Sequence, residues 1–160
     1  MKFSTISLLV TTILWGILLG GVVYSHLVFF PVYLSDLPRS AAITNGTYAI
    51  QEEIFWLMIH PLLIIALITS LISNWKLRAR RKLILIPLFV YVAALVITTI
   101  YFVPELMNFK SSPTSGIPDS EWASRAKNWM IFSMIRGAFL LLAAIPLFVA
   151  LTKNENNAAD

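Results

Sequence analysis

The residues that could carry chemistry in this 160-residue chain are few, and they lie inside or beside long apolar stretches. Two histidines and one arginine lie inside these stretches: His26, His60 and Arg136. Two acids, Glu53 and Glu105, lie at their margins. A charged side chain at the centre of a bilayer costs about 2.5 to 3.5 kcal/mol on insertion scales, so such residues mark a functional site by default.

Three kinds of chemistry fit these residue types. A neutral histidine can abstract a proton from an acidic apolar substrate while Arg136 stabilises the oxyanion that forms. Alternatively, His26 and His60 can ligate haem b as a pair on neighbouring antiparallel helices. With a carboxylate from Glu53 or Glu105, the same histidines can hold a transition metal. The cofactor is therefore open between haem b, a transition metal and none, whereas the absence of cysteine excludes a thiolate site.

The spacing of these residues places them at a common depth. If the first apolar stretch ends near Tyr33 and the second begins near Glu53, each histidine lies seven residues into its stretch. At a rise of 1.5 Å per residue, this is about 10 Å below one membrane surface. Arg136 lies eight or nine residues into the last stretch. We therefore expect a polar site in the outer half of a helix bundle.

Polar and aromatic residues at helical spacing extend this site. Trp56 lies between Glu53 and His60, and Tyr101 precedes Glu105 by one turn. Trp129 and Ser133 precede Arg136 on the same face of the last stretch. The candidate catalytic residues are His26, His60, Arg136 and Glu105. The candidate substrate-binding residues are Glu53, Trp56, Tyr101, Asn108, Trp129 and Ser133.

A structural interpretation of the same residues is also open. Arg136 can pair with Glu53 or Glu105, and the histidines can satisfy carbonyl groups that Pro31 and Pro61 leave free. The tryptophans can form a belt at the level of the headgroups. The polar cluster then only locks the helix bundle of a non-enzymatic accessory subunit.

The elements that must position these residues are membrane helices. The residue types AVILMFWYC make up 58% of the chain, and 12% of the residues are charged, against about 25% in soluble domains. Four apolar stretches are each near or above the roughly 20 residues with which a helix crosses a bilayer. We predict an all-α integral membrane protein in which one four-helix transmembrane bundle forms a single domain. The helices lie at about residues 7–33, 54–73, 83–103 and 128–151, followed by a polar tail at 153–160.

The sequence also predicts the nature of the first stretch and of the segment before the last helix. The first stretch exceeds the 7–15-residue core of a signal peptide, so we expect it to be a retained anchor. Residues 104–124 contain three prolines and are expected to form a loop, with a short interfacial start of the last helix at Asp119 or Ser120.

The basic residues predict the topology. Five cations lie in the seven residues at 76–82, and Lys2 and Lys153 fall on the same side of the membrane. By the positive-inside rule, we expect both termini to be cytoplasmic, and we expect the protein to lie in the cell (inner) membrane. These solvated cations account for the net charge of +4, so no nucleic-acid partner is expected. The expected partners are the lipid bilayer, a small apolar ligand, and either further copies of the chain or a larger membrane complex.

Short motifs in the last two stretches form a pattern that is also found in other membrane proteins. The segment YFVPELMN at 101–108 is followed by a polar loop and then by Trp129, Ser133 and Arg136, and the first stretch ends in Phe-Phe-Pro. This pattern resembles the anthrone oxygenase-like family of small four-helix membrane proteins. The resemblance implies oxidation of an anthrone to an anthraquinone with dioxygen, with patterned positions at Asn108, Trp129 and Arg136. That family commonly has His or Asn where Ser133 stands, and neither histidine of this chain is part of the resemblance.

These observations predict a small membrane protein that binds a small apolar or quinone-like molecule in a polar His/Glu/Arg site and, in the enzymatic hypothesis, oxidises it. Such an enzyme is an oxidoreductase or oxygenase, either cofactor-independent or metal-dependent. One alternative is a redox protein with haem b or a metal on His26 and His60. The other is the non-enzymatic accessory subunit.

Overall fold

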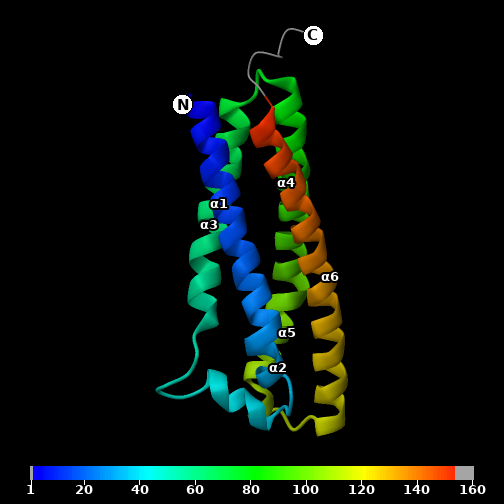
Figure 1. The fold of residues 1–160 in the computed structure, drawn as a ribbon. Coiled ribbons are helices and arrows are strands. Elements are labelled where there is room, and N and C mark those ends of the chain that lie inside the picture. Colours follow the sequence, from blue (N-terminus) through cyan, green and yellow to red (C-terminus); the bar gives the residue numbers. More distant parts are fainter. Residues whose placement is uncertain (1, 154–160) are drawn as a thin grey trace. The chain divides into compact units, whose positions relative to one another are not determined.

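The computed structural model describes residues 2–153, which are largely helical and contain no strand (Figure 1). Two of its short elements, η1 and η3, are π-helical turns, and two others, η2 and η4, are 3₁₀ turns. The elements follow one another as α1 (Phe3–Tyr24), η1 (Ser25–Phe29), α2 (Phe30–Tyr33), η2 (Arg39–Thr44), α3 (Glu52–Ser73), α4 (Arg78–Ile97), η3 (Thr98–Phe102), α5 (Val103–Lys110), η4 (Ser112–Thr114) and α6 (Asp119–Thr152).

Four helical runs within the described residues are long and apolar enough to cross a membrane. They are Phe3–Tyr33, Glu52–Ser73, Arg78–Lys110 and Asp119–Thr152. Apolar side chains remain on their outer faces, as Leu27 and Phe89 illustrate with exposed fractions of 74% and 72%. The predicted all-α class with four candidate spans is confirmed, and it indicates an integral membrane protein. The side of the membrane on which each terminus lies stays a prediction, and most of the predicted polar tail lies outside the described residues.

The helices extend further than the apolar stretches. The third run continues to Lys110, so the prediction that a loop begins at residue 104 is wrong. The reason is that a π-helical turn, η3, comes directly before Pro104, and such a local adjustment lets a membrane helix continue through a proline. The last run begins at Asp119, which confirms the expected start of that helix ahead of its apolar part.

Two π-helical turns interrupt the first and third runs. The N–H group of Phe30 donates to the carbonyl of Ser25, and that of Val103 donates to the carbonyl of Thr98. In both cases a proline follows directly, at positions 31 and 104. Such turns insert an extra residue into an α-helix and are frequent at functional sites.

The structure divides into two compact units, which are described separately. Unit 1 consists of the described residues of Met1–Gly20, Glu53–Ala93 and Ala138–Asp160. Unit 2 consists of Gly21–Glu52 and Ala94–Gly137. That the whole chain forms a single domain stays a prediction.

Polar contacts join the helices of unit 1. In Figure 1 the first part of α1 lies beside α3, and the Thr11 hydroxyl donates to the carbonyl of Ala66 on α3 at 2.9 Å. The indole N–H of Trp15 donates to the carbonyl of Leu140 on α6 at 3.1 Å. In lipid, where helices gain no hydrophobic energy from each other, such hydrogen bonds and close packing hold a bundle together.

One cation of the basic run is buried in unit 1. Arg80 is only 5% exposed. Its guanidinium donates to the carbonyl of Lys153 at 3.0 Å, to the hydroxyl of Thr5 at 3.1 Å and to the side-chain oxygen of Asn74 at 3.3 Å. The prediction that all five cations of this run are solvated is therefore wrong for Arg80, which ties together three segments of the chain.

The core of unit 2 is rich in aromatic rings. The Phe30 ring lies 4.6 Å from that of Trp129, and the Phe102 ring lies 5.5 Å from it. The buried members are Phe29, Phe30, Tyr33, Leu37, Ala41, Phe102, Phe109, Trp122, Ala126 and Trp129. Trp122 and Trp129 are thus packed inside the unit, which does not fit the interpretation of these two residues as a headgroup belt.

Candidate functional site

Polar side chains from three of the helical runs meet inside unit 2. His26 lies in η1, Thr98 in η3, and Ser133 and Arg136 on α6. The imidazole Nε2 of His26 is 3.0 Å from Ser133 Oγ. Arg136 donates from Nη2 to Ser133 Oγ at 3.2 Å and from Nη1 to Thr98 Oγ1 at 2.6 Å. Ser133 is fully buried, whereas His26 and Arg136 are half-buried.

The local sequence explains how these groups come together. Ser133 and Arg136 are three residues apart and therefore share a face of α6. The next residue is Gly137, where a Cβ atom would lie only 3.2 Å from Val22 Cγ1 on α1. Glycine thus permits the close approach of α1 and α6 that brings His26 to Ser133.

The hydrogen bonds of His26 define its neutral tautomer. Its Nδ1 lies 2.7 Å from the carbonyl oxygen of Val22, and because a carbonyl only accepts, Nδ1 carries the proton. Nε2 of the neutral ring is then an acceptor, and the Ser133 hydroxyl donates to it. Since Ser133 Oγ also accepts from Arg136, donation runs from the guanidinium through the hydroxyl to the imidazole.

The charge of Arg136 has no carboxylate partner among the described residues of unit 2. Its hydrogen-bond partners there are the hydroxyls of Thr98 and Ser133, and its Cζ lies 4.0 Å from the centre of the Phe102 ring. The Thr98 hydroxyl in turn donates to the carbonyl of Ala94 at 2.6 Å, which leaves its oxygen to accept from Arg136. A guanidinium has five N–H donors, so this side chain retains donors for an anionic ligand.

Aromatic rings line this polar group. The Phe30 ring meets that of His26 edge to face at 5.4 Å. The indole N–H of Trp129 donates to the backbone carbonyl of Phe102 at 3.2 Å, and the Trp129 ring packs 5.5 Å from the Phe102 ring that lies under Arg136. Direct contact of Trp129 with a ligand stays a prediction. Buried rings beside a few polar groups are typical of sites for small apolar ligands.

Glu105 belongs to a separate network in the same unit. Both of its oxygens accept from Arg125, at 2.5 Å each, and Oε2 also accepts from Asn108 at 3.1 Å. The Arg125 guanidinium lies 4.5 Å from the Trp122 ring. The interpretation in which Glu105 neutralises Arg136 is therefore wrong, because Arg125 takes that place.

Tyr101 lies at the edge of the aromatic core rather than among the polar groups. It is half-buried, and its ring packs 5.1 Å from Phe102 and 5.9 Å from Phe132. These ring contacts do not test whether Tyr101 touches a ligand directly, and that role stays a prediction.

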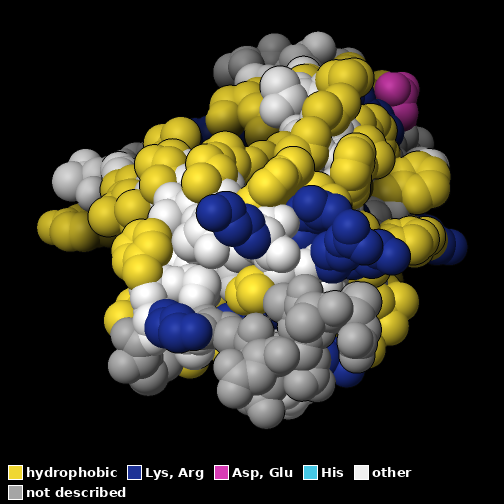
Figure 2. Space-filling view, turned by 90° about the horizontal axis from the view of Figure 1, so that it is seen from above, with side chains coloured by type: hydrophobic (Ala, Val, Ile, Leu, Met, Phe, Trp, Pro, Cys, Tyr) yellow, Lys and Arg dark blue, Asp and Glu magenta, His cyan; other side chains and the backbone are white. Residues whose placement is uncertain are grey.

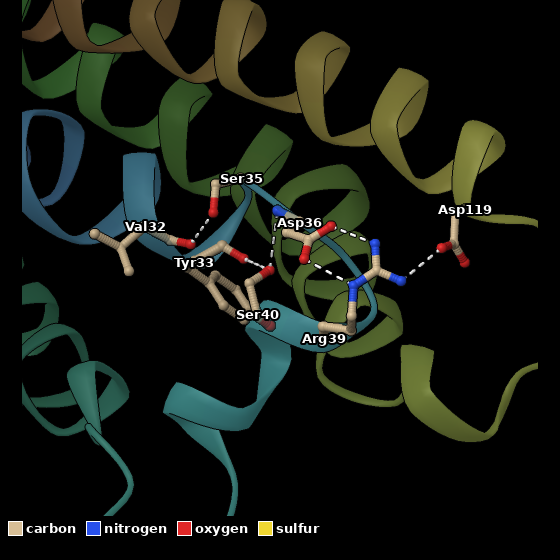
Figure 3. A network of polar contacts seen from close by, with 7 residues as sticks. All are labelled: Val32, Tyr33, Ser35, Asp36, Arg39, Ser40 and Asp119. Carbon is tan, nitrogen blue, oxygen red and sulfur yellow. Dashed lines mark hydrogen bonds and ion pairs between the residues drawn. The ribbon is translucent and has the colours of Figure 1, made fainter.

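The loop before α3 carries a polar network of its own (Figure 3). Arg39 donates from Nε to Asp36 at 2.8 Å and from Nη1 to Asp119 at 2.9 Å. The hydroxyl of Ser40 donates to the carbonyl of Tyr33 at 2.7 Å. Arg39 holds the pKa of the Asp36 carboxyl below its usual value by donating to it, and Asp36 raises the pKa of Arg39 in return. This network ties the loop to the start of α6.

His60 lies in unit 1 and has different partners. Its Nδ1 is 2.7 Å from the hydroxyl of Tyr91, and its ring stacks on that of Trp56 at 5.7 Å. Tyr91 is 1% exposed. Glu53 also belongs to unit 1 and is exposed. A haem or a metal shared by His26 and His60 stays a prediction, because the two histidines belong to different units. Among residues 2–153, no three His, Cys, Asp or Glu side chains are grouped so that they could hold a metal ion.

Sequence reasoning missed Thr98, Phe102 and Tyr91. All three lie in apolar stretches and carry no charge, so nothing in their own residue types distinguishes them. The signal that could have drawn attention to the first two is Pro104, which follows the π-helical turn Thr98–Phe102 closely.

Comparisons with models of known protein families, with curated proteins and with solved structures found no match. The site of unit 2 therefore has to be interpreted from its own chemistry.

Proposed function

We propose that this membrane protein binds a small apolar molecule with an acidic proton in unit 2 and promotes its oxidation by dioxygen. One observation carries the proposal: the Arg136 guanidinium lacks a carboxylate partner within its unit and is linked through Ser133 to the acceptor nitrogen of His26. Burying a charge without a partner is expensive, and a ligand that becomes anionic during the reaction would supply that partner.

In this proposal, each residue has one task. The Nε2 atom of His26 takes the acidic proton when the ligand displaces the hydrogen bond from the Ser133 hydroxyl, while the Val22 carbonyl keeps the ring in the required tautomer. The remaining N–H groups of Arg136 stabilise the oxyanion that is left. Ser133 is fully buried, so it aligns the two groups rather than contacting the ligand. The aromatic rings of the unit receive the apolar body of the ligand.

An anthrone is the substrate class we propose, on the strength of the resemblance in the last two spans. Loss of one ring C–H proton turns an anthrone into an aromatic oxyanion, which suits a base beside a guanidinium. Addition of dioxygen to the same carbon, followed by loss of water, yields the anthraquinone. One dioxygen is consumed and one water is released for each anthrone, so the atoms and electrons balance without another reactant.

The topology and membrane are part of the proposal. The seven cations at positions 2, 76–82 and 153 favour cytoplasmic termini in the cell membrane. The chain would draw its ligand from the lipid phase, in which anthrones dissolve.

The test uses purified chain in detergent with anthrone as the probe. Dioxygen uptake and anthraquinone absorbance are followed together against a protein-free blank. We expect His26→Ala to lower the protein-dependent rate by about 10² to 10⁴-fold, as for loss of a general base, and Arg136→Gln by about 10² to 10³-fold. Lys127→Gln, at an exposed position of α6, is the control and should keep the native rate. No protein-dependent oxidation, or an equal rate in the His26 variant, would contradict the proposal.

A further inference from the structure

The end of unit 1 at the turn between α3 and α4 carries positive charge that residues 2–153 do not neutralise. Figure 2 looks down on this end and shows Lys and Arg side chains grouped among apolar ones. Lys76, Arg78 and Lys82 are exposed and make no hydrogen bond or ion pair with the described residues. Glu53 is the one acid of unit 1 within residues 2–153, and it lies at the other end of α3. The length of α3, about 33 Å, therefore separates Glu53 from these cations.

These cations are held in place by a rigid turn. Asn74 is fully buried and donates to the carbonyls of Ser4 and Ser70, each at 2.9 Å. The buried Arg80 donates to the Asn74 side chain. Since these contacts fix the turn from inside, the neighbouring cations are presented on a defined surface rather than on a loose tail.

The position of this turn places the cations at the membrane surface. One candidate span ends at Ser73 and the next begins at Arg78, so the turn lies where two spans leave the bilayer. Trp75 is 53% exposed, and the Arg81 guanidinium lies 5.1 Å from its ring. Tryptophan and arginine are typical of the headgroup region.

The start of α4 adds to the unbalanced charge. Arg78, Arg80, Arg81 and Lys82 are among its first five residues, and its first turn contains no acid. The N-terminal end of a helix already carries positive partial charge, which favours anions there. An external anion would therefore relieve repulsion that the described part of the chain leaves in place.

We propose that Lys76, Arg78, Arg81 and Lys82 bind the phosphate groups of anionic phospholipids in the adjoining leaflet. The chemistry recognised is a phosphate at headgroup depth, and the source is the bilayer in which the spans lie. A basic residue near an anionic membrane surface contributes about a fivefold gain in affinity. The site is independent of the ligand site proposed for unit 2.

The experiment measures lipid selectivity of the full chain reconstituted in phosphatidylcholine bilayers. Spin-labelled phosphatidylglycerol and spin-labelled phosphatidylcholine are compared by electron paramagnetic resonance for the fraction held at the protein surface. We expect the native chain to prefer phosphatidylglycerol by at least about fivefold. Combining Lys76→Gln, Arg78→Gln, Arg81→Gln and Lys82→Gln should bring the preference close to one.

Three controls test whether the preference depends on the positive charge at this turn. Lys127→Gln, in unit 2, should keep the preference, and so should the charge-conserving pair Arg78→Lys and Arg81→Lys. Raising the salt concentration should weaken the preference of the native chain, which tests the proposal even if the fourfold variant fails to fold.

Four results would overturn the proposal. They are no preference in the native chain, a preference that survives the fourfold variant, displacement of the lipid by inorganic phosphate at constant ionic strength, and tighter binding of a short DNA duplex than of phosphatidylglycerol vesicles. The third would point to a site for free phosphate and the fourth to a site for nucleic acid.

Discussion

Replacing Arg136 by methionine separates a ligand-binding arginine from a structural one. Arg136→Met removes two hydrogen bonds from a charged donor, at 2.6 and 3.2 Å, each worth about 1.5 to 3 kcal/mol. It also removes the contact with the Phe102 ring, worth about 0.5 to 2 kcal/mol. Against these losses, the variant avoids the desolvation of a buried charge, which costs several kcal/mol and is not offset by a carboxylate in unit 2. We therefore expect a net change in unfolding free energy within about 2 kcal/mol.

Removing one of the hydroxyl partners of Arg136 should lower the free energy of unfolding by more than the small change in the side chain suggests. Thr98→Val keeps the guanidinium and deletes one charge-assisted hydrogen bond, so we expect a destabilisation of about 1.5 to 3 kcal/mol. In the Arg136→Met background the same substitution should cost close to nothing, because the bond is already gone.

Thermal unfolding of the purified chain in detergent measures these differences. For a chain of this length, 1 kcal/mol corresponds to a shift of about 2 to 4 °C in Tm. A loss of more than about 4 kcal/mol in Arg136→Met would refute the reasoning. Such a loss would show that the arginine is retained because it stabilises the fold.

Two further predictions concern charges outside the site. Arg80→Gln should destabilise the protein by about 2 to 5 kcal/mol, because its three hydrogen bonds are lost at a buried position, whereas Arg78→Gln, at an exposed position, should stay within about 0.5 kcal/mol in the same melting experiment. The Arg39 contact lowers the pKa of Asp36. The contribution of this contact to stability is therefore present above the ordinary pKa of a carboxyl group, and it is lost as the pH falls through the lowered value. The Tm of the native chain should therefore exceed that of Arg39→Gln at neutral pH, and the two Tm values should converge as the pH falls. A difference in Tm that grows in acid would contradict this prediction.

The membrane spans could be predicted because lipid offers the backbone no hydrogen-bond partners. A chain that crosses hydrocarbon must pair its peptide groups within each segment, so an apolar stretch of sufficient length defines a helix. The helix ends were harder to predict: the start of α6 at Asp119 was expected, but α5 was not, since its polar residues gain no support from hydropathy. Their stability depends on packing, as the burial of Phe109 and Trp122 shows.

The site could be predicted only in part. His26, Ser133 and Arg136 were identified because polar groups at membrane depth need partners, and the structure brings these three together. Glu105 was expected among them because it lies at the margin of its apolar stretch, on the same side of the membrane. The π-helical turn η3 inserts an extra residue before Glu105, which rotates the following face by about 100°. Spacing arguments fail across such a turn, and a neutral partner such as Thr98 cannot be recognised from its residue type.

The most direct test of the central claim is the position of the proton on the His26 ring. Nitrogen NMR of chain labelled with ¹⁵N-histidine, assigned with a His26→Gln variant, distinguishes the two ring nitrogens. The account predicts a neutral ring with the proton on Nδ1, an Nε2 signal that shifts in Ser133→Ala, and a further shift when anthrone is added. A proton on Nε2, or a signal indifferent to both Ser133→Ala and anthrone, would contradict it.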